Sequence, residues 1–313
     1  MKSTVGNMTD LTDIKDLYKK CRLCPRKCGV NRAVGERGFC GAGANPYVAR
    51  AALHQWEEPC LSGTNGSGTV FFSGCSLGCV FCQNAEISRG AAGKEIDTAR
   101  LSDIFLELEE KGAHNINLVS SSHYTPSVIE ALDLAKARGL KIPIVYNSSG
   151  YESADTLRLL EGYIDIYLPD FKYVSSVLSE KYSHAKDYSE RAKETLAEMV
   201  RQQPRAVFDE SGIMQRGVIV RHLMLPDCAR DSRAVLEYLY KTYGDSIYIS
   251  IMRQFTPTAE LRDKHPELSR RITDKEYGRM LDFCDALGIE RGFSQETGCE
   301  EESFIPPFDL EGV

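Results

Sequence analysis

The sequence lacks an apolar run long enough to cross a membrane and lacks an excess of basic residues. No stretch approaches the ~18 uninterrupted apolar residues of a membrane-spanning helix, and the first thirteen residues do not carry basic residues followed by an apolar run. Lys and Arg number 38 against 45 Asp and Glu, which gives a net charge of −7. We therefore expect a cytoplasmic protein without membrane insertion, and we regard nucleic acid as an unfavourable partner for the surface as a whole.

Cysteine, in contrast, is plentiful and grouped. Eight of the eleven cysteines lie before residue 83. An odd total in tight groups does not fit a disulfide framework and indicates metal ligation under reducing conditions. With 313 residues, of which 42% are hydrophobic, the chain can bury a sizeable core without covalent cross-links.

Three thiols lie within eight residues, at Cys75, Cys79 and Cys82, with three and then two residues between them. Three thiolates can hold three irons of a 4Fe-4S cluster and leave the fourth iron open to a small molecule. A structural zinc site is the alternative, but it needs a fourth Cys or His, and none follows Cys82 until His114. The spacing therefore favours a cluster with an open iron.

This triad, with Phe81 just before its last thiol, resembles the signature of the radical S-adenosylmethionine (SAM) superfamily. In that superfamily the open iron chelates SAM, and one electron from the cluster cleaves SAM to a 5′-deoxyadenosyl radical that abstracts hydrogen from the substrate. The resemblance implies a 4Fe-4S cluster bound by three Cys, SAM as cofactor, and an oxidoreductase-type enzyme. It also implies an electron donor such as flavodoxin or ferredoxin, and cofactor contacts from Phe81 and Asn84.

A second group of four cysteines lies nearer the N-terminus, with two, three and eleven residues between successive thiols: Cys21, Cys24, Cys28 and Cys40. A structural zinc site and an auxiliary 4Fe-4S cluster both fit this spacing, and reduced core cysteines are the alternative. Five basic residues among them would offset the charge of a four-thiolate site: Arg22, Arg26, Lys27, Arg32 and Arg37. These basic residues could instead contact nucleic acid, but a single interleaved aromatic makes that interpretation weaker.

From residue 69 onward, strand patterns alternate with helix patterns. Strands are expected at 69–72, 116–119, 142–146, 164–168, 218–223 and 247–251. Helices are expected at 101–112, 125–139, 153–160, 186–200, 235–244 and 273–287, the last beginning with a capping box of Thr273 and Glu276. The alternation predicts an α/β fold with a parallel sheet, as an open sheet or as a barrel. The superfamily resemblance implies the barrel, a partial (β/α)6 TIM-like barrel with its cofactors at the C-terminal ends of the strands.

We divide the chain into three parts on this basis. Residues 1–62 form a small Cys-rich N-terminal head, and residues 63–296 form the radical SAM partial barrel. Residues 297–313 form a C-terminal arm packed over the barrel, with a disordered acidic tail as the alternative.

Polar residues follow the second and third predicted strands, where a barrel places its chemistry. After the second strand, Ser121 and His123 are candidate SAM ligands, at the place where related proteins carry a Gly-Gly-Glu segment. Helix capping by this serine-rich turn is an equal alternative. Asn147 follows the third strand, at a position where the glycyl-radical activases carry an acid. The amide makes a bound monovalent cation less favourable.

The fourth and fifth strands carry further candidates. Asp170 and Lys172 follow the fourth strand and resemble the Asp-x-Lys segment that helps to bind SAM in the glycyl-radical activases. An exposed ion pair is the alternative, and such a pair would contribute little free energy. Arg221 and His222 lie within the fifth strand and could line the cavity, although a histidine in an apolar strand is more often a core residue.

Four longer segments resemble the family of pyruvate formate-lyase activating enzyme homologues, and they lie at residues 21–32, 147–152, 167–172 and 304–309. This resemblance implies hydrogen abstraction that activates a glycyl-radical protein, so that the partner would be a protein or peptide substrate. Modification of another peptide or of a small molecule is the second hypothesis. A zinc-binding module without enzymatic activity is the third. Kinship of fold alone does not fix the substrate.

Overall fold

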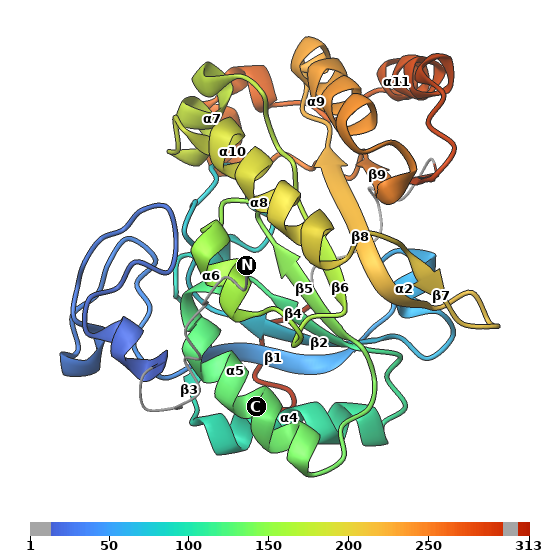
Figure 1. Ribbon diagram of the computed structural model, residues 1–313. Helices are drawn as coiled ribbons and strands as arrows, with labels where there is room; N and C mark the ends of the chain where they lie inside the picture. The colour runs from blue at the N-terminus through green and yellow to red at the C-terminus, as the bar shows by residue number, and fades with distance from the viewer. Residues whose placement is uncertain (1–13, 297–305) are drawn as a thin grey trace, which may run out of the picture.

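The computed structural model describes residues 14–296 and 306–313 and is built around one curved β-sheet (Figure 1). Along the sheet the strands lie in the order β10-β9-β8-β6-β5-β4-β2-β1-β3, with β7 beside β8. The strands are β1 (Tyr47–His54), β2 (Ser67–Phe72), β3 (Lys94–Glu95), β4 (Ile116–Val119), β5 (Ile144–Ser148), β6 (Ile166–Pro169), β7 (Val207–Phe208), β8 (Met214–Leu223), β9 (Tyr248–Met252) and β10 (Gly292–Ser294).

Neighbouring strands from β2 through β4, β5, β6, β8 and β9 to β10 are all parallel. The six predicted strands are present, and the α/β partial barrel is confirmed. Sequence analysis missed β10, because a three-residue strand carries no measurable period. It also missed β1, which pairs antiparallel with β2 and β3. β1 and the short helix α2 (Pro59–Ser62) fall within the predicted head, yet β1 belongs to the sheet.

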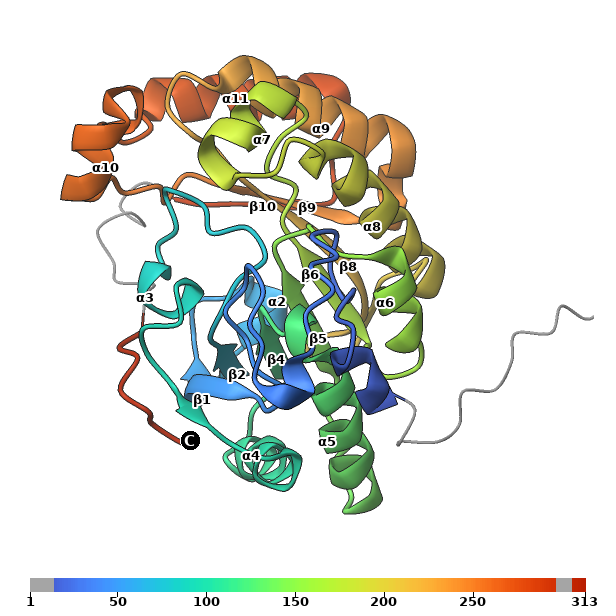
Figure 2. The ribbon, with the colours of Figure 1, turned by 90° about the vertical axis from the view of Figure 1, so that its left-hand side faces the viewer.

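The longer helices cover the outer face of the sheet (Figures 1 and 2). All six predicted helices are present, and the capping box of Thr273 and Glu276 forms with both of its hydrogen bonds. Besides α2, the helices are α3 (Ala85–Ser88), α4 (Thr98–Glu110), α5 (Thr125–Ala137), α6 (Ala154–Leu159), α7 (Ser176–Ser183), α8 (Tyr188–Gln202), α9 (Ala229–Tyr243), α10 (Ala259–Lys264) and α11 (Asp274–Leu287).

Both faces of β2, β4, β5 and β6 are buried, which explains their mainly apolar sequences. Ile116 and Leu118 of β4 belong to the main core, which also contains the buried faces of α4 and α5. A second apolar cluster joins Val145, Ile166 and Ile219 of three strands to α2. The strand interior is thus largely apolar at this level, where Thr69 and Asn117 are buried polar residues of β2 and β4.

The described C-terminal residues, 306–313, lie along the outer edge of β1. The Leu310 N–H donates to the Ala49 carbonyl oxygen (3.1 Å), and the Ala51 N–H donates to the Glu311 carbonyl oxygen (2.8 Å). These bonds cover part of an edge strand that would otherwise offer unpaired backbone groups. Residues 297–305 of the predicted arm lie outside the described residues.

Residues 14–46, which we call the head loops, consist mostly of loops and short turns of 3-10 helix and project from one side of the barrel (Figures 1 and 2). The Tyr18 hydroxyl contacts the Ser127 hydroxyl of α5 at 2.9 Å. The Thr156 hydroxyl of α6 donates to the Leu23 carbonyl oxygen at 2.8 Å. The head loops therefore lie against two of the barrel helices.

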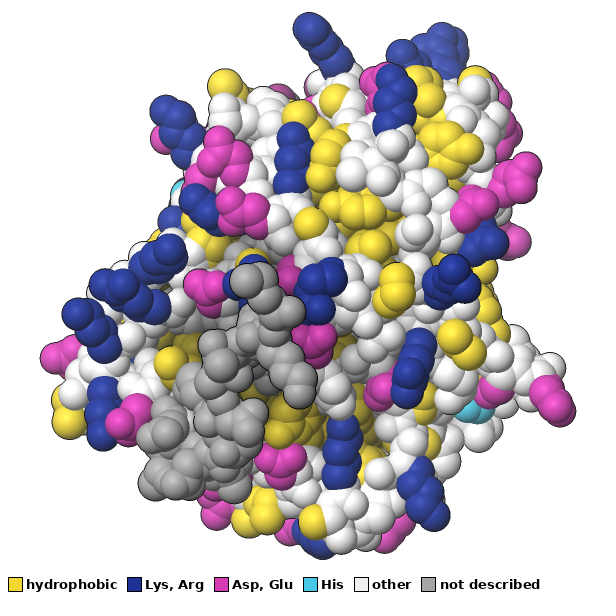
Figure 3. Space-filling model, in the orientation of Figure 1, with side chains coloured by type: hydrophobic (Ala, Val, Ile, Leu, Met, Phe, Trp, Pro, Cys, Tyr) yellow, Lys and Arg dark blue, Asp and Glu magenta, His cyan; other side chains and the backbone are white. Residues whose placement is uncertain are grey.

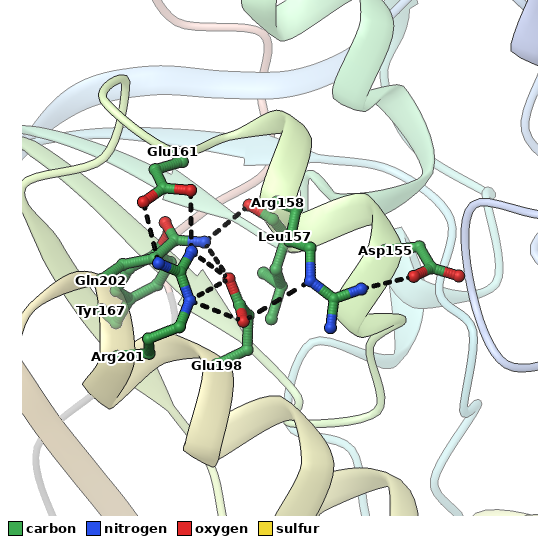
Figure 4. A network of polar contacts seen from close by, with 8 residues as sticks. All are labelled: Asp155, Leu157, Arg158, Glu161, Tyr167, Glu198, Arg201 and Gln202. Atoms are coloured by element: carbon green, nitrogen blue, oxygen red, sulfur yellow. Dashed lines mark hydrogen bonds and ion pairs between the residues drawn. The ribbon is translucent and has the colours of Figure 1, made fainter. Parts of the chain in front are cut away.

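A polar network fastens α8 to α6 and to β6 (Figure 4). The Arg201 guanidinium donates two parallel hydrogen bonds to Glu161 (3.0 and 2.7 Å) and further bonds to Glu198. Gln202 donates to the Leu157 carbonyl oxygen of α6 (3.0 Å) and accepts from the Tyr167 hydroxyl of β6. This network fixes α8 relative to the strand ends.

Candidate functional site

A cavity of about 810 Å³ lies at the C-terminal ends of the parallel strands. It is lined by the residues that follow β2, β4, β5, β6, β8, β9 and β10, and it also contacts the segment between β1 and α2. Its volume is within the ~300–1,000 Å³ that is usual for cofactor and ligand sites. Such a position is the one that barrels use for chemistry.

The loop that leaves β2, residues 73–84, places the three thiols of the triad on this cavity. Gly74 has φ +94°, and a Cβ there would lie 2.6 Å from the Cys40 carbonyl oxygen, so only glycine fits. The Leu77 N–H points to the Cys75 sulfur at 3.4 Å. The Cys79 sulfur lies 2.9 Å from the Ser183 hydroxyl of α7.

Burial keeps the Cys79 and Cys82 thiols neutral when no metal is bound. It raises the pKa of the Cys79 thiol to about 12 and also raises the pKa of Cys82. The charge of Lys172 acts in the opposite direction on both. Metal binding must displace these protons, and a nearby cation lowers that cost.

The triad fits a 4Fe-4S cluster better than a single metal ion. Among residues 14–296 and 306–313, no three His, Cys, Asp or Glu side chains are arranged to hold one ion. Cluster thiolates need not converge on one point, because each binds a different iron. Cys75, Cys79 and Cys82 are the cysteines of the cavity lining, so a cluster held by them would keep one iron open to a ligand.

Asp170 and Lys172, which follow β6, line the same cavity and form an ion pair with each other. Their side chains are only 26% and 15% exposed, so this is not a solvated surface pair. Burial lowers the pKa of Lys172, but the negative charge of Asp170 outweighs it and holds the pKa above its usual value. The Lys172 ammonium is therefore a fixed positive charge beside the thiols.

The Tyr188 hydroxyl of α8 positions this segment. It accepts from the Lys172 N–H (2.9 Å) and lies within hydrogen-bond distance of the Ser149 and Asp170 carbonyl oxygens (2.9 and 3.1 Å). Gly150, with φ +75°, allows the loops after β5 and β6 to touch, because a Cβ there would lie 2.1 Å from the Asp170 carbonyl oxygen. One hydroxyl thus ties two strand-end loops together.

Three further predicted residues line the cavity. Asn147 lies near the end of β5, and Asn84 precedes α3 at the end of the cluster loop. Phe81 is 8% exposed and packs edge-on between Tyr173 and Phe255, with ring centroids 6.5 and 6.4 Å away. Phe81 therefore anchors the cluster loop to the barrel.

The other two predicted residues, Ser121 and His123, do not line the cavity. His123 is buried, and its Nε2 lies 2.9 Å from the Ser73 carbonyl oxygen. Burial lowers the pKa of His123 to about 4, so the imidazole is neutral and ties the turn after β4 to the cluster loop. Ser120, which adopts φ +59°, lines the cavity instead.

Sequence analysis missed a charged network on the cavity wall. Arg221 of β8 lines the cavity and pairs with the buried Glu58 (Nε to Oε1, 2.8 Å) and with Glu57, which also accepts from Asn117 of β4 (2.9 Å). Burial raises the pKa of Glu58, but Arg221 outweighs it and the net shift is downward. The two glutamates precede α2, so no strand-end pattern reveals them. His222 is a core residue that contacts the Phe171 carbonyl oxygen at 2.8 Å.

An amide chain that was also not predicted joins the cluster loop to the last two strands. Gln83 of the cluster loop donates to the Gln254 carbonyl oxygen at 3.0 Å. The Gln295 side chain accepts from the Gln254 N–H (3.2 Å) and donates to the Gln254 side chain. All three residues line the cavity, so the wall between the cluster loop and β10 is polar.

Glu152 does not line the cavity but contacts residues of the turn after β4 and of β5. Its carboxyl group is buried and accepts from the Ser122 hydroxyl (2.7 Å) and the Tyr146 hydroxyl (3.5 Å). Burial raises the pKa of Glu152 to about 7, against the effect of these donors. Sequence analysis included this residue only as part of a family segment, because an isolated glutamate in a loop gives no sign of burial.

We predict that the contribution of Glu152 to the free energy of unfolding is lost as pH rises toward and through about 7. A raised carboxyl pKa stabilises the folded state below the unfolded value of about 4.5, and that contribution disappears above the folded value. Relative to Glu152→Gln, the wild-type free energy of unfolding should fall by about 2 kcal/mol between pH 5.5 and 8. Urea unfolding at both pH values measures this, with Glu180→Gln on the exposed face of α7 as control. An equal difference at both pH values would contradict it.

Comparison with known proteins identifies the central part of the chain. Residues 69–214 match the family described as the Radical SAM superfamily. The uncharacterized protein MJ0674 of Methanocaldococcus jannaschii is 29% identical over 285 residues, which cover 88% of this chain and 77% of the relative. None of the described helices is long and apolar enough to cross a membrane.

Solved structures of SuiB from Streptococcus suis are also similar. SuiB bound to S-adenosylmethionine is 11% identical with a TM-score of 0.47, over 72% of this chain and 48% of SuiB. SuiB bound to the precursor peptide SuiA is 10% identical with a TM-score of 0.46, over 72% of this chain and 47% of SuiB. The matched region thus spans less than half of SuiB.

The superfamily implies a 4Fe-4S cluster and SAM as cofactors, and the triad fits that cluster. The hypothesis of a zinc-binding module without enzymatic activity is therefore wrong. Residues 69–214 form a radical SAM superfamily domain, and the chain that carries it is an enzyme.

Proposed function

We propose that the enzyme abstracts a hydrogen atom from a glycine residue of a partner protein, and so activates a glycyl-radical protein. The observation that carries the proposal is that Asp170, Lys172 and the three thiols of the triad line one cavity. The Asp-x-Lys segment resembles the one that helps to bind SAM in the glycyl-radical activases. When bound together, the reduced cluster and SAM would supply the hydrogen-abstracting radical.

The side chains of the cavity have separate tasks in this proposal. The triad would hold the cluster, and Lys172 would pair with the SAM carboxylate or bond a ribose hydroxyl. Asp170 would accept from a donor on SAM or orient Lys172. Phe81, Asn84 and Asn147 would complete the cofactor contacts. The network of Arg221 with two glutamates leaves one side of the cavity charged, where a substrate with polar groups could bind.

Modification of another peptide or of a small molecule remains the second hypothesis. Transfer of deuterium from a labelled protein glycine into 5′-deoxyadenosine would distinguish the two. An electron donor such as flavodoxin or ferredoxin is the proposed partner. All ten described cysteines are free thiols, which supports a reducing location such as the cytoplasm.

The triad is tested by single replacements. Cys75→Ala, Cys79→Ala or Cys82→Ala should each abolish SAM cleavage by the dithionite-reduced protein, because two thiolates cannot hold the cluster with a defined open iron. Anaerobic reconstitution followed by quantification of 5′-deoxyadenosine measures this. Cys60→Ala, at a buried cysteine outside the cavity lining, is the control. Full cleavage in any triad variant would refute the assignment.

Lys172 is tested by SAM affinity. Loss of one partner of a partly buried, charge-assisted contact costs about 2–5 kcal/mol, so Lys172→Ala should weaken SAM binding by at least about tenfold. The iron content should not change. Equilibrium binding of SAM to both proteins measures this, with Lys181→Ala of α7 as control, because Lys181 does not line the cavity. Unaltered affinity would remove the proposed role of the segment after β6.

We also propose that the head loops hold a second metal site through Cys21, Cys24, Cys28 and Cys40. Backbone hydrogen bonds fold this segment back on itself, from the Cys21 N–H to the Val30 carbonyl oxygen (3.0 Å) and from the Gly29 N–H to the Cys21 carbonyl oxygen (2.9 Å). The first two cysteines are buried, the last is partly buried and Cys28 is exposed.

The buried Arg32 supports this second site. Its guanidinium is 2% exposed and lies over the Tyr18 ring (4.5 Å) with Nη1 3.8 Å from the Cys21 sulfur. It donates to the carbonyl oxygens of His123 and Gly43, and among the described residues its Nε has no hydrogen-bond partner. A buried cation needs a compensating anion, which a four-thiolate metal complex would supply and neutral thiols would not.

Metal analysis tests the second site and chooses its metal. About eight irons per chain would support an auxiliary cluster, which the positions of the described side chains favour because no three of them are arranged to hold one ion. About four irons with one zinc would support a structural zinc site. Cys24→Ser should lose the second metal while keeping the iron of the triad. About four irons without zinc in the wild-type protein would refute the site.

A further inference from the structure

The head loops carry a charge opposite to that of the remaining chain. Residues 14–46 contain eight Lys or Arg and two Asp or Glu, a net charge of +6, whereas the whole chain carries −7 and the remainder therefore −13. Lys and Arg side chains gather along the edge where Figure 1 draws the head loops (Figure 3). Four exposed cations of the head loops define what we call the basic head surface: Lys20, Arg22, Lys27 and Arg37.

The head loops that carry the basic head surface contact the cluster loop through Arg26 and Phe39. Arg26, between two members of that surface in sequence, donates from Nε to the Ser76 carbonyl oxygen at 2.9 Å. The Arg26 guanidinium stacks on Phe39, 4.0 Å from the ring centroid, and a Cβ on Gly78 would lie 3.9 Å from the same ring. Phe39 is 51% exposed. The head loops do not line the cavity. A partner protein bound to the basic head surface would therefore approach the cluster loop without entering the cavity.

We infer that the basic head surface docks an acidic electron-transfer protein, and this inference rests on the proposed function. One electron would leave the reduced donor and enter the oxidised cluster, with no bond formed or broken and no proton moved. Because docking occurs outside the cavity, reduction can proceed while SAM and substrate occupy it. Complementary charge steers such encounters and raises their association rate, and transient electron-transfer complexes need only small interfaces.

A polyanion such as nucleic acid is the competing occupant, and it fits less well. Binding of a single strand uses several exposed aromatic rings on a basic groove. Phe39 is the one exposed aromatic ring of residues 14–46, and the Arg26 guanidinium already covers one face of it.

Charge reversal tests the inference with two reductants. We would compare wild-type protein with Arg22→Glu/Lys27→Glu, and use Lys275→Glu/Arg279→Glu on the exposed face of α11 as a control with the same change in charge. SAM cleavage is measured with a reduced acidic flavodoxin and, separately, with dithionite, at low and high ionic strength. Iron and zinc content is measured for every protein. Because dithionite needs no docking surface, it reports on the proposed function alone.

The head variant should lose at least about tenfold in the flavodoxin-driven rate at low salt and much of its salt dependence. Its dithionite-driven rate and the rates of the α11 control should be unchanged. If the head variant loses metal, Lys20→Glu/Arg37→Glu takes its place with the same expectation.

Three results would overturn the inference. The first is an unchanged flavodoxin-driven rate in the head variant. The second is an equal loss with both reductants in a variant that retains its metal. The third is oligonucleotide binding, measured by fluorescence anisotropy, that the variant abolishes while the flavodoxin-driven rate stays unchanged. Failure of dithionite-driven cleavage in the wild-type protein would refute the proposed function instead, and binding of oxidised flavodoxin to wild type and variant would still test docking.

Discussion

The parallel register of β2, β4, β5 and β6 is the constraint on which the candidate site depends. It sets Phe71 opposite Val119 and Asn147 opposite Leu168, so the ends of these strands meet around one cavity. Side chains alternate between the two faces of a strand, and a slip by one residue would turn Asn147 away from the cavity. The continuous apolar runs on both faces of these strands hold the register in place.

The loops at the strand ends are held by hydrogen bonds to neighbouring elements. Tyr188 of α8 joins the loops after β5 and β6, and α8 itself is fastened to α6 by the network around Arg201. His123 joins the turn after β4 to the cluster loop. These contacts hold the loops that place Lys172 and the triad thiols on one cavity.

Much of the site could be predicted from local spacing. The three thiols of the triad lie within eight residues, so their spacing can be recognised without knowing how the barrel is arranged. Asp170 and Lys172 directly follow a strand that the sequence predicts at residues 164–168. Ser121 was predicted as a ligand because it follows the second strand, at the place where related proteins carry a Gly-Gly-Glu segment. Ser120, which has a left-handed φ, lines the cavity instead. Alternation rules apply only while the backbone stays extended.

Contacts between distant segments could not be predicted in this way. Glu57 and Glu58 reach Arg221 across more than 160 residues of sequence, and a loop carboxylate looks the same in the sequence whether it is solvated or buried. Whether the buried positive charge of Arg32 has an anion beside it likewise depends on which groups fold around it. A single sequence without related sequences contains no signal for such pairs.

The central claim is that SAM binds to an open iron of a cluster held by Cys75, Cys79 and Cys82. Electron–nuclear double resonance of the reduced protein with SAM labelled by ¹⁷O at its carboxylate and ¹⁵N at its amino group tests it most directly. The account predicts hyperfine coupling of both labels to the cluster, absent when any triad cysteine is replaced. A reduced cluster that binds SAM without coupling to either label would contradict it.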